Sequence, residues 1–134
     1  MPCRLVNNAL PAALLVLLAG CSSMGGSDKA YWAVGQEPFW QITVQDEVLM
    51  LRTPDQPVGD TIAVRHQPLP NGARWQGSHQ SRPFSFEVRA SPCRDVMSGA
   101  LFTHTAEWQS GNRQAAGCAI SGTQAPPWRE GDAP

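Results

Sequence analysis

Residues 84–89 read Phe-Ser-Phe-Glu-Val-Arg, and this short stretch decides the fold class of the chain. Its apolar side chains at positions 84, 86 and 88 alternate with polar side chains at positions 85, 87 and 89. Because successive side chains of a β-strand point to opposite faces of a sheet, this period of two predicts a strand with one buried and one solvated face. Helical periodicity is nearly absent from the chain beyond residue 20.

Stretches of the same kind lie on both sides of this strand, separated by turns rich in Pro and Gly. Residues 53–60 contain two prolines and are predicted to form a loop, and Ser91 and Pro92 are predicted to end the strand that begins at Phe84. The chain therefore predicts an all-β fold, a small antiparallel barrel or curled sheet of about seven to eight strands, because closure limits free strand edges. The other predicted strands cover residues 40–44, 48–52, 61–65, 73–77, 102–108 and 113–119.

The N-terminus predicts export and lipidation. Arg4 precedes the apolar run of residues 10–18, which is too short for a bilayer span of about 20 residues and suits a cleaved signal peptide. The sequence Leu-Ala-Gly-Cys at residues 18–21 resembles the lipobox of bacterial lipoproteins, which implies that Cys21 is acylated and becomes the first mature residue. The alternative is an ordinary cleaved signal. Ser22 stands where an Asp would favour inner-membrane retention, so this resemblance implies a periplasm-facing position on the outer membrane.

Length and charge fit a single small domain. We divide the chain into a signal peptide (1–20), a flexible tether (21–30), a β-domain (31–122) and a disordered tail (123–134). The chain carries 10 Lys and Arg residues against 11 Asp and Glu residues, which leaves no basic footprint for nucleic acid. The expected partners are the membrane, through the lipid anchor, and a protein or small-molecule ligand in the periplasm.

Two cysteines of the mature chain remain besides the lipid site. Cys93 and Cys118 are expected to form a disulfide, because the periplasm is oxidising. A loop of that size contributes roughly 3 kcal/mol in the chain-entropy account. Metal binding is the weaker alternative, since neither cysteine belongs to a CxxC motif and no HExxH occurs. No metal site and no cofactor is predicted.

Two stretches concentrate chemistry, GQEPFW at residues 35–40 and CRDVMSG at residues 93–99. Phe39 and Trp40 are adjacent, so in a strand they face opposite sides, and one of them is expected in the core. Asp95 has a structural alternative as a turn cap that accepts from the backbone N–H of Met97 or Ser98. If the chain has one functional site, the two stretches are expected to meet in space. The candidate binding residues are Glu37, Phe39, Trp40, Arg94, Asp95 and Ser98.

Four motifs in order carry a family resemblance: GxEPFW from residue 35, LRTP from residue 51, CxDxMSG from residue 93 and GC from residue 117. Together they resemble a family of small, uncharacterised bacterial envelope lipoproteins, some of which are associated with META-type (HslJ-like) domains. The resemblance implies an envelope lipoprotein of β structure. It implies no activity and no catalytic residues.

Two functional hypotheses follow. The first is a non-enzymatic binding module; one version is an inhibitor of lysozyme-like hydrolases, in which a loop bearing Arg94, Asp95 and Ser98 enters an acidic active site. The second is an envelope enzyme or metal-handling protein, which requires Glu37, Asp95 and a histidine to converge. The three histidines are scattered along the sequence and no G-x-S-x-G motif occurs, so no catalytic residue is assigned.

Overall fold

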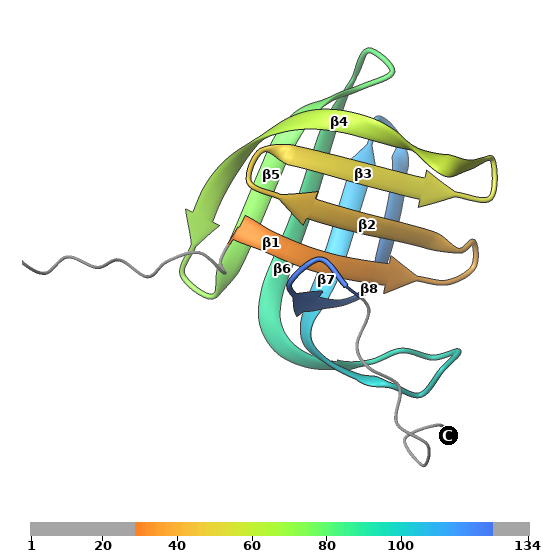
Figure 1. Cartoon of the computed structure of the whole chain (residues 1–134), viewed down its shortest axis with the longest axis vertical. Coiled ribbons are helices and arrows are strands. Elements are labelled where there is room, and N and C mark those ends of the chain that lie inside the picture. Colours follow the sequence, from red (N-terminus) through yellow and green to blue (C-terminus); the bar gives the residue numbers. More distant parts are fainter. Residues whose placement is uncertain (1–28, 125–134) are drawn as a thin grey trace, which may run out of the picture.

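The computed structural model describes residues 29–124, and these form a closed antiparallel β-barrel (Figure 1). Each strand pairs with the next along the chain, and β8 pairs with β1 to close the barrel. The predicted all-β fold is confirmed. The predicted signal peptide, the lipidation site Cys21 and the greater part of the tether and tail lie outside the described residues. The strands are β1 (Ala30–Gly35), β2 (Trp40–Gln45), β3 (Val48–Thr53), β4 (Gln56–Leu69), β5 (Gly72–His79), β6 (Arg82–Arg94), β7 (Leu101–Ser110) and β8 (Arg113–Ser121).

Side chains fill the barrel interior. The alternating stretch 84–89 lies in β6, and its three apolar side chains belong to the main core as predicted. Trp40, Trp75 and Phe86 are the largest fully buried side chains, and the rings of Trp75 and Phe86 stack with centroids 5.5 Å apart. The tryptophans of β2, β5 and β7 therefore act as core residues, which is how a small barrel buries enough apolar area to be stable. No helix among the described residues is long and apolar enough to cross a membrane.

The connections divide the barrel into two ends. The loop at residues 36–39 and the turns at 54–55, 80–81 and 111–112 lie at one end, which we call the distal end. The chain enters β1 at the opposite, proximal end, where the backbone N–H of Asp46 donates to the carbonyl of Lys29. A two-residue turn at 111–112 joins β7 to β8, because Ser110 pairs with Arg113 across it.

The β6–β7 hairpin extends beyond the barrel as an arm, defined here as residues 91–103 (Figure 1). The register shifts between Ala90 and Cys93, and such a bulge bends the paired strands. The predicted disulfide between Cys93 and Cys118 is confirmed, and it ties the arm to the outer side of β8. Phe102 of the arm stacks on Trp32 of β1 with ring centroids 6.0 Å apart.

A second, smaller core lies under the arm, outside the barrel. Ala33 and Ala119 point into the main core, so their neighbours on β1 and β8 point outward beneath the arm. The strand β1 is thus covered on both faces. Its run Ala-Tyr-Trp-Ala-Val has no polar alternation, which is why a period-two reading did not predict it. The second core contains Val34, Phe102 and Cys118, with Trp32, Cys93, Ala100 and Ile120 packed against it.

Two predictions based on proline are wrong. The loop predicted for residues 53–60 is only a turn at residues 54–55, after which β4 runs without a break from Gln56 to Leu69. Pro92 does not end β6, which continues to Arg94. Pro54 lies in the turn, whereas Pro57 and Pro92 lie where the strand register shifts. A residue without a backbone N–H is tolerated there because no ladder hydrogen bond is lost.

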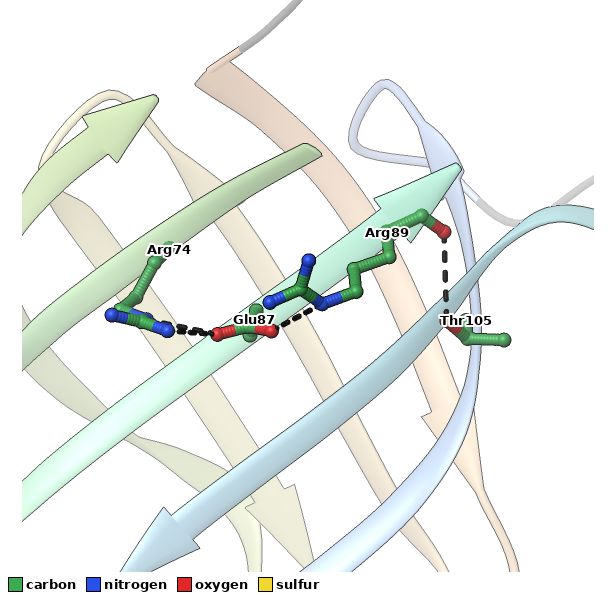
Figure 2. Close-up of polar contacts among 4 residues, drawn as sticks. All are labelled: Arg74, Glu87, Arg89 and Thr105. Atoms are coloured by element: carbon green, nitrogen blue, oxygen red, sulfur yellow. Dashed lines mark hydrogen bonds and ion pairs between the residues drawn. The ribbon is translucent and has the colours of Figure 1, made fainter. Parts of the chain in front are cut away.

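An ion-pair network crosses the outer face of β5 and β6 (Figure 2). Glu87 accepts from Arg74 at 2.6 Å through one carboxylate oxygen and from Arg89 at 2.6 Å through the other. Burial by itself raises the pKa of Glu87, but the hydrogen bonds and charges of Arg74 and Arg89 outweigh it, so the pKa lies below its ordinary value of 4.5. The carboxylate therefore stabilises the fold above pH 4.5, and this contribution is lost as the pH falls through the lowered pKa.

We expect Glu87→Gln to lower the free energy of unfolding by about 0.5–1 kcal/mol at neutral pH, a modest value because both arginines are partly exposed. The difference from wild type should shrink as the pH falls below the lowered pKa, and urea titrations at several pH values measure it. Glu107→Gln is the matched control, since Glu107 lies directly opposite Glu87 on β7 and repels it. That change should be neutral or slightly stabilising. If Glu87→Gln and Glu107→Gln lower the free energy of unfolding equally, the assigned role of Glu87 is contradicted.

Candidate functional site

The loop between β1 and β2 is anchored by Trp40 against two glycines. A Cβ atom on Gly35 would lie 2.1 Å from Nε1 of Trp40, and one on Gly117 would lie 2.1 Å from the carbonyl oxygen of Val34. The same Cβ on Gly117 would lie 2.9 Å from the indole ring of Trp40. Gly35, Trp40 and Gly117 therefore form one steric unit. This unit explains physically why the GxEPFW and GC motifs occur in the same chain.

The stretch 93–99 folds back on itself at the tip of the arm. The buried carboxylate of Asp95 accepts from the backbone N–H of Ser98 at 2.9 Å and from its hydroxyl at 2.6 Å. Gly99 N–H donates to the carbonyl of Asp95, and Arg94 donates to the carbonyl of Gly99 at 2.6 Å. The turn-cap role predicted for Asp95 is confirmed, with Ser98 as its partner. Asp95, Ser98 and Arg94 thus all hold the loop closed.

The two predicted stretches meet, as expected from the sequence. A concavity of about 590 Å³, which we call the arm concavity, lies between the β1–β2 loop and the arm tip. Glu37 contributes from the loop, Arg94 and Asp95 contribute from the arm, and the outer face of β8 forms the floor. Glu37 adopts a positive φ of 61°, a left-handed conformation that is uncommon for a residue with a side chain. Three of the six candidate residues therefore line one hollow.

Phe39 and Trp40 belong to a different hollow. The barrel-end concavity, of about 470 Å³, opens at the distal end between the β1–β2 loop and the turns at 54–55 and 111–112. Phe39 is 42% exposed and Trp40 is 1% exposed, which confirms that one of the two adjacent rings lies in the core. Phe39 belongs to the loop before β2, so the expected alternation across a strand does not apply and both rings line the same hollow. Ser98 lines neither of these two hollows. The β1–β2 loop is thus a wall between two concavities, each with its own set of candidate residues.

Histidine does not converge with Glu37 and Asp95. His66, His79 and His104 are absent from the lining of the arm concavity. Within residues 29–124, no three His, Cys, Asp or Glu side chains lie close enough together to hold a metal ion. The arrangement required by the enzyme or metal hypothesis is therefore missing at this place in the described chain.

A Ser–His–Asp cluster does occur elsewhere, and sequence reasoning missed it. His79 contacts the hydroxyl of Ser110 through Nδ1 at 3.1 Å and the carboxylate of Asp60 through Nε2 at 2.8 Å. Its three residues come from β4, β5 and β7, and only strand pairing brings them together. Ser110 is only 5% exposed and His79 is 9% exposed, so both side chains belong to the buried part of the barrel. The ring of His79 packs edge to face against Phe84, so the cluster is a buried polar contact beside the core at the distal end.

Sequence reasoning also missed an apolar patch on the arm, because it looked for polar chemistry there. Val96, Met97 and Leu101 are 83%, 66% and 63% exposed, respectively. We call these three residues the apolar tip. Val96 and Met97 lie within the closed Asp95–Ser98 turn and Leu101 follows it, and the polar groups of the turn are already bonded within the loop. The tip thus presents apolar side chains at the end of an arm that the disulfide and the second core hold in place.

Comparison of the chain with protein-family models, with curated proteins and with solved structures finds no match. The resemblance to envelope lipoproteins stays a prediction based on the four motifs. Functional conclusions therefore rest on the geometry of the described residues.

Proposed function

We propose that this chain is a non-enzymatic binding module, anchored by lipid at Cys21 to the periplasmic face of the outer membrane, that recognises a protein partner through the apolar tip. The observation that carries the proposal is the contrast at the end of the arm. The polar side chains of Asp95 and Ser98 bond each other, while Val96, Met97 and Leu101 are left exposed. Apolar side chains held together in water on a rigid support favour a protein contact.

Rigidity of the arm supports this role. The disulfide at Cys93 and the stacked pair of Trp32 and Phe102 hold the arm against β1 and β8 before any partner arrives. A preorganised contact surface loses less conformational entropy on binding than a mobile loop does. Glu37 and Arg94 are exposed beside the apolar tip and supply the polar rim that protein interfaces commonly have.

One concrete version of the proposal is inhibition of a lysozyme-like hydrolase. In this version Val96 and Met97 enter the apolar part of the enzyme's cleft. The guanidinium of Arg94, exposed beside them, faces the acidic residues. Asp95 and Ser98 act by holding the loop closed. Incubating the protein with c-type and g-type lysozymes tests this version, and unchanged lysis at micromolar protein removes it.

The proposal itself is tested by capture from envelope extract, followed by rebinding of the identified, purified partner. We expect Val96→Ser combined with Met97→Ser to weaken that binding at least about tenfold, since a few central apolar residues carry most of the energy of an interface. Val58→Ser is the matched control, because Val58 is an equally exposed valine on β4, far from the arm in sequence. Equal binding by the tip variant and the control, or no specific partner of the wild-type protein, would refute the proposal.

The enzyme alternative keeps one favourable observation, that Glu37 and Asp95 line the same concavity. Asp95, however, is buried and bonded twice to Ser98, so its carboxylate has a structural role already. Glu37 alone supplies neither a nucleophile with its base nor a metal-ligand set. Binding is therefore the function that the site supports best.

A further inference from the structure

We infer that the barrel-end concavity binds a neutral sugar ring, independently of any protein bound at the apolar tip. The concavity lies at the distal end, across the β1–β2 loop from the arm concavity. Its volume of about 470 Å³ falls within the range of roughly 300–1,000 Å³ that is typical of small-molecule sites.

Phe39 is the exposed aromatic ring of this site, and two almost fully buried indoles support it from the core. These indoles, of Trp40 and Trp108, pack edge to face beneath it with centroids 6.2 Å apart. Aromatic rings present flat, weakly negative faces, and the C–H groups on one side of a pyranose ring suit such a face. The rings of Trp108 and Phe84 also stack, so the floor is held rigidly from below.

The rim of the site is polar and its charges cancel. Asp55 comes from the β3–β4 turn, whereas Asn112, Arg113 and Gln114 come from the β7–β8 turn and the start of β8. The guanidinium of Arg113 lies 5.6 Å from the ring centroid of Trp108, which holds it over the aromatic floor. The rim therefore offers a carboxylate, two side-chain amides and a guanidinium, which supply both donors and acceptors.

This combination selects for a neutral, hydroxyl-rich ligand with an apolar face. Asp55 and Arg113 have opposite charges, so the rim gives neither an anion nor a cation a net Coulomb attraction. A hydroxyl group both donates and accepts, so it can satisfy the carboxylate, the amides and the guanidinium in turn. A purely apolar ligand would instead leave these polar groups desolvated without partners.

Titration of the protein with N,N′-diacetylchitobiose and with cellobiose, followed by saturation-transfer NMR, tests the inference. We expect saturable, millimolar binding of at least one of these neutral disaccharides. Phe39→Ala should weaken it roughly three- to tenfold, the contribution of one aromatic contact. Arg113→Gln should weaken it by a similar factor through loss of a charged donor. Val58→Ala and Arg65→Gln are the matched controls on β4, both exposed and outside the concavity, and they should bind as wild type does.

Hexanoate and hexylamine serve as an anionic and a cationic probe, respectively, and each has a six-carbon chain. Tighter binding of either than of both disaccharides would overturn the assignment of a neutral ligand. No saturable sugar binding, or sugar binding that Phe39→Ala and Arg113→Gln both leave unchanged, would overturn the site itself. Phe39 and Arg113 are exposed at the surface, so neither change removes core packing, and thermal unfolding of each variant verifies the fold.

Discussion

Trp40→Ala is expected to lower the free energy of unfolding by about 3–5 kcal/mol, which is the range for truncating a large aromatic side chain in a packed core. Trp40 is almost fully buried, and its indole fills the space left free by Gly35 and Gly117. The backbone beside these glycines belongs to β1 and β8, which close the barrel, so the resulting cavity lies at the seam. Urea denaturation, read as a change in midpoint at constant slope, measures the loss.

Trp40→Phe is the control that separates packing from hydrogen bonding. The indole Nε1 of Trp40 is buried without a hydrogen-bond partner among the described residues. Replacing it by phenylalanine keeps an aromatic ring and removes an unsatisfied donor, so the loss should be only about 1–2 kcal/mol. If Trp40→Phe lowers the free energy of unfolding as much as Trp40→Ala does, the indole Nε1 makes a stabilising polar contact after all.

Removal of the disulfide has the second large expected effect. Replacing Cys93 and Cys118 together by alanine should lower the free energy of unfolding by roughly 3 kcal/mol, because the unfolded chain regains the entropy of an open loop of 25 residues. The change should also release the arm, since the stacking of Phe102 on Trp32 then has only the small second core to support it. Hydrogen exchange within residues 91–103 should accelerate more than exchange within the barrel strands β2 and β3.

The wild-type protein under reducing conditions is the matched comparison for the double alanine variant. Both should have a lower denaturation midpoint than the oxidised protein, because both lack the covalent link. The alanine variant should be the less stable of the two, because it also lacks the sulfur atoms that pack in the second core. Binding of the protein partner should also weaken in both, while the sugar titration should change little, since no cysteine lines the barrel-end concavity. If the double alanine variant keeps the stability and the hydrogen-exchange rates of the wild-type protein, the disulfide does not hold the arm.

Sequence patterns predicted those features that depend on neighbouring residues. The alternation at 84–89 predicted a strand with a buried face, and the adjacency of Phe39 and Trp40 predicted that one of the two lies in the core. The cap of Asp95 on Ser98 spans three residues and was predicted for the same reason. Each depends on the geometry of a single strand or turn, which the local sequence largely fixes.

The features that the sequence did not reveal depend on contacts between distant strands. The strand β1 looked like an apolar run, because only the folded arm gives Trp32 and Val34 an outer face to bury. The cluster of His79 with Ser110 and Asp60 forms only when strand register places three separated positions side by side.

The sequence by itself determined the all-β class, a size of about seven to eight strands and the disulfide, whereas the structure decided that the sheet closes into a barrel of eight. The alternation of side chains, and the pairing of two cysteines in a compartment expected to be oxidising, need little long-range information. Only the tertiary structure decided that residues 84–89 belong to a strand that leaves the barrel as an arm, and that the six candidate residues are divided between two hollows and a closed turn. The physical reason is that register shifts and ring closure depend on every strand pair at once, so no single stretch of sequence specifies them.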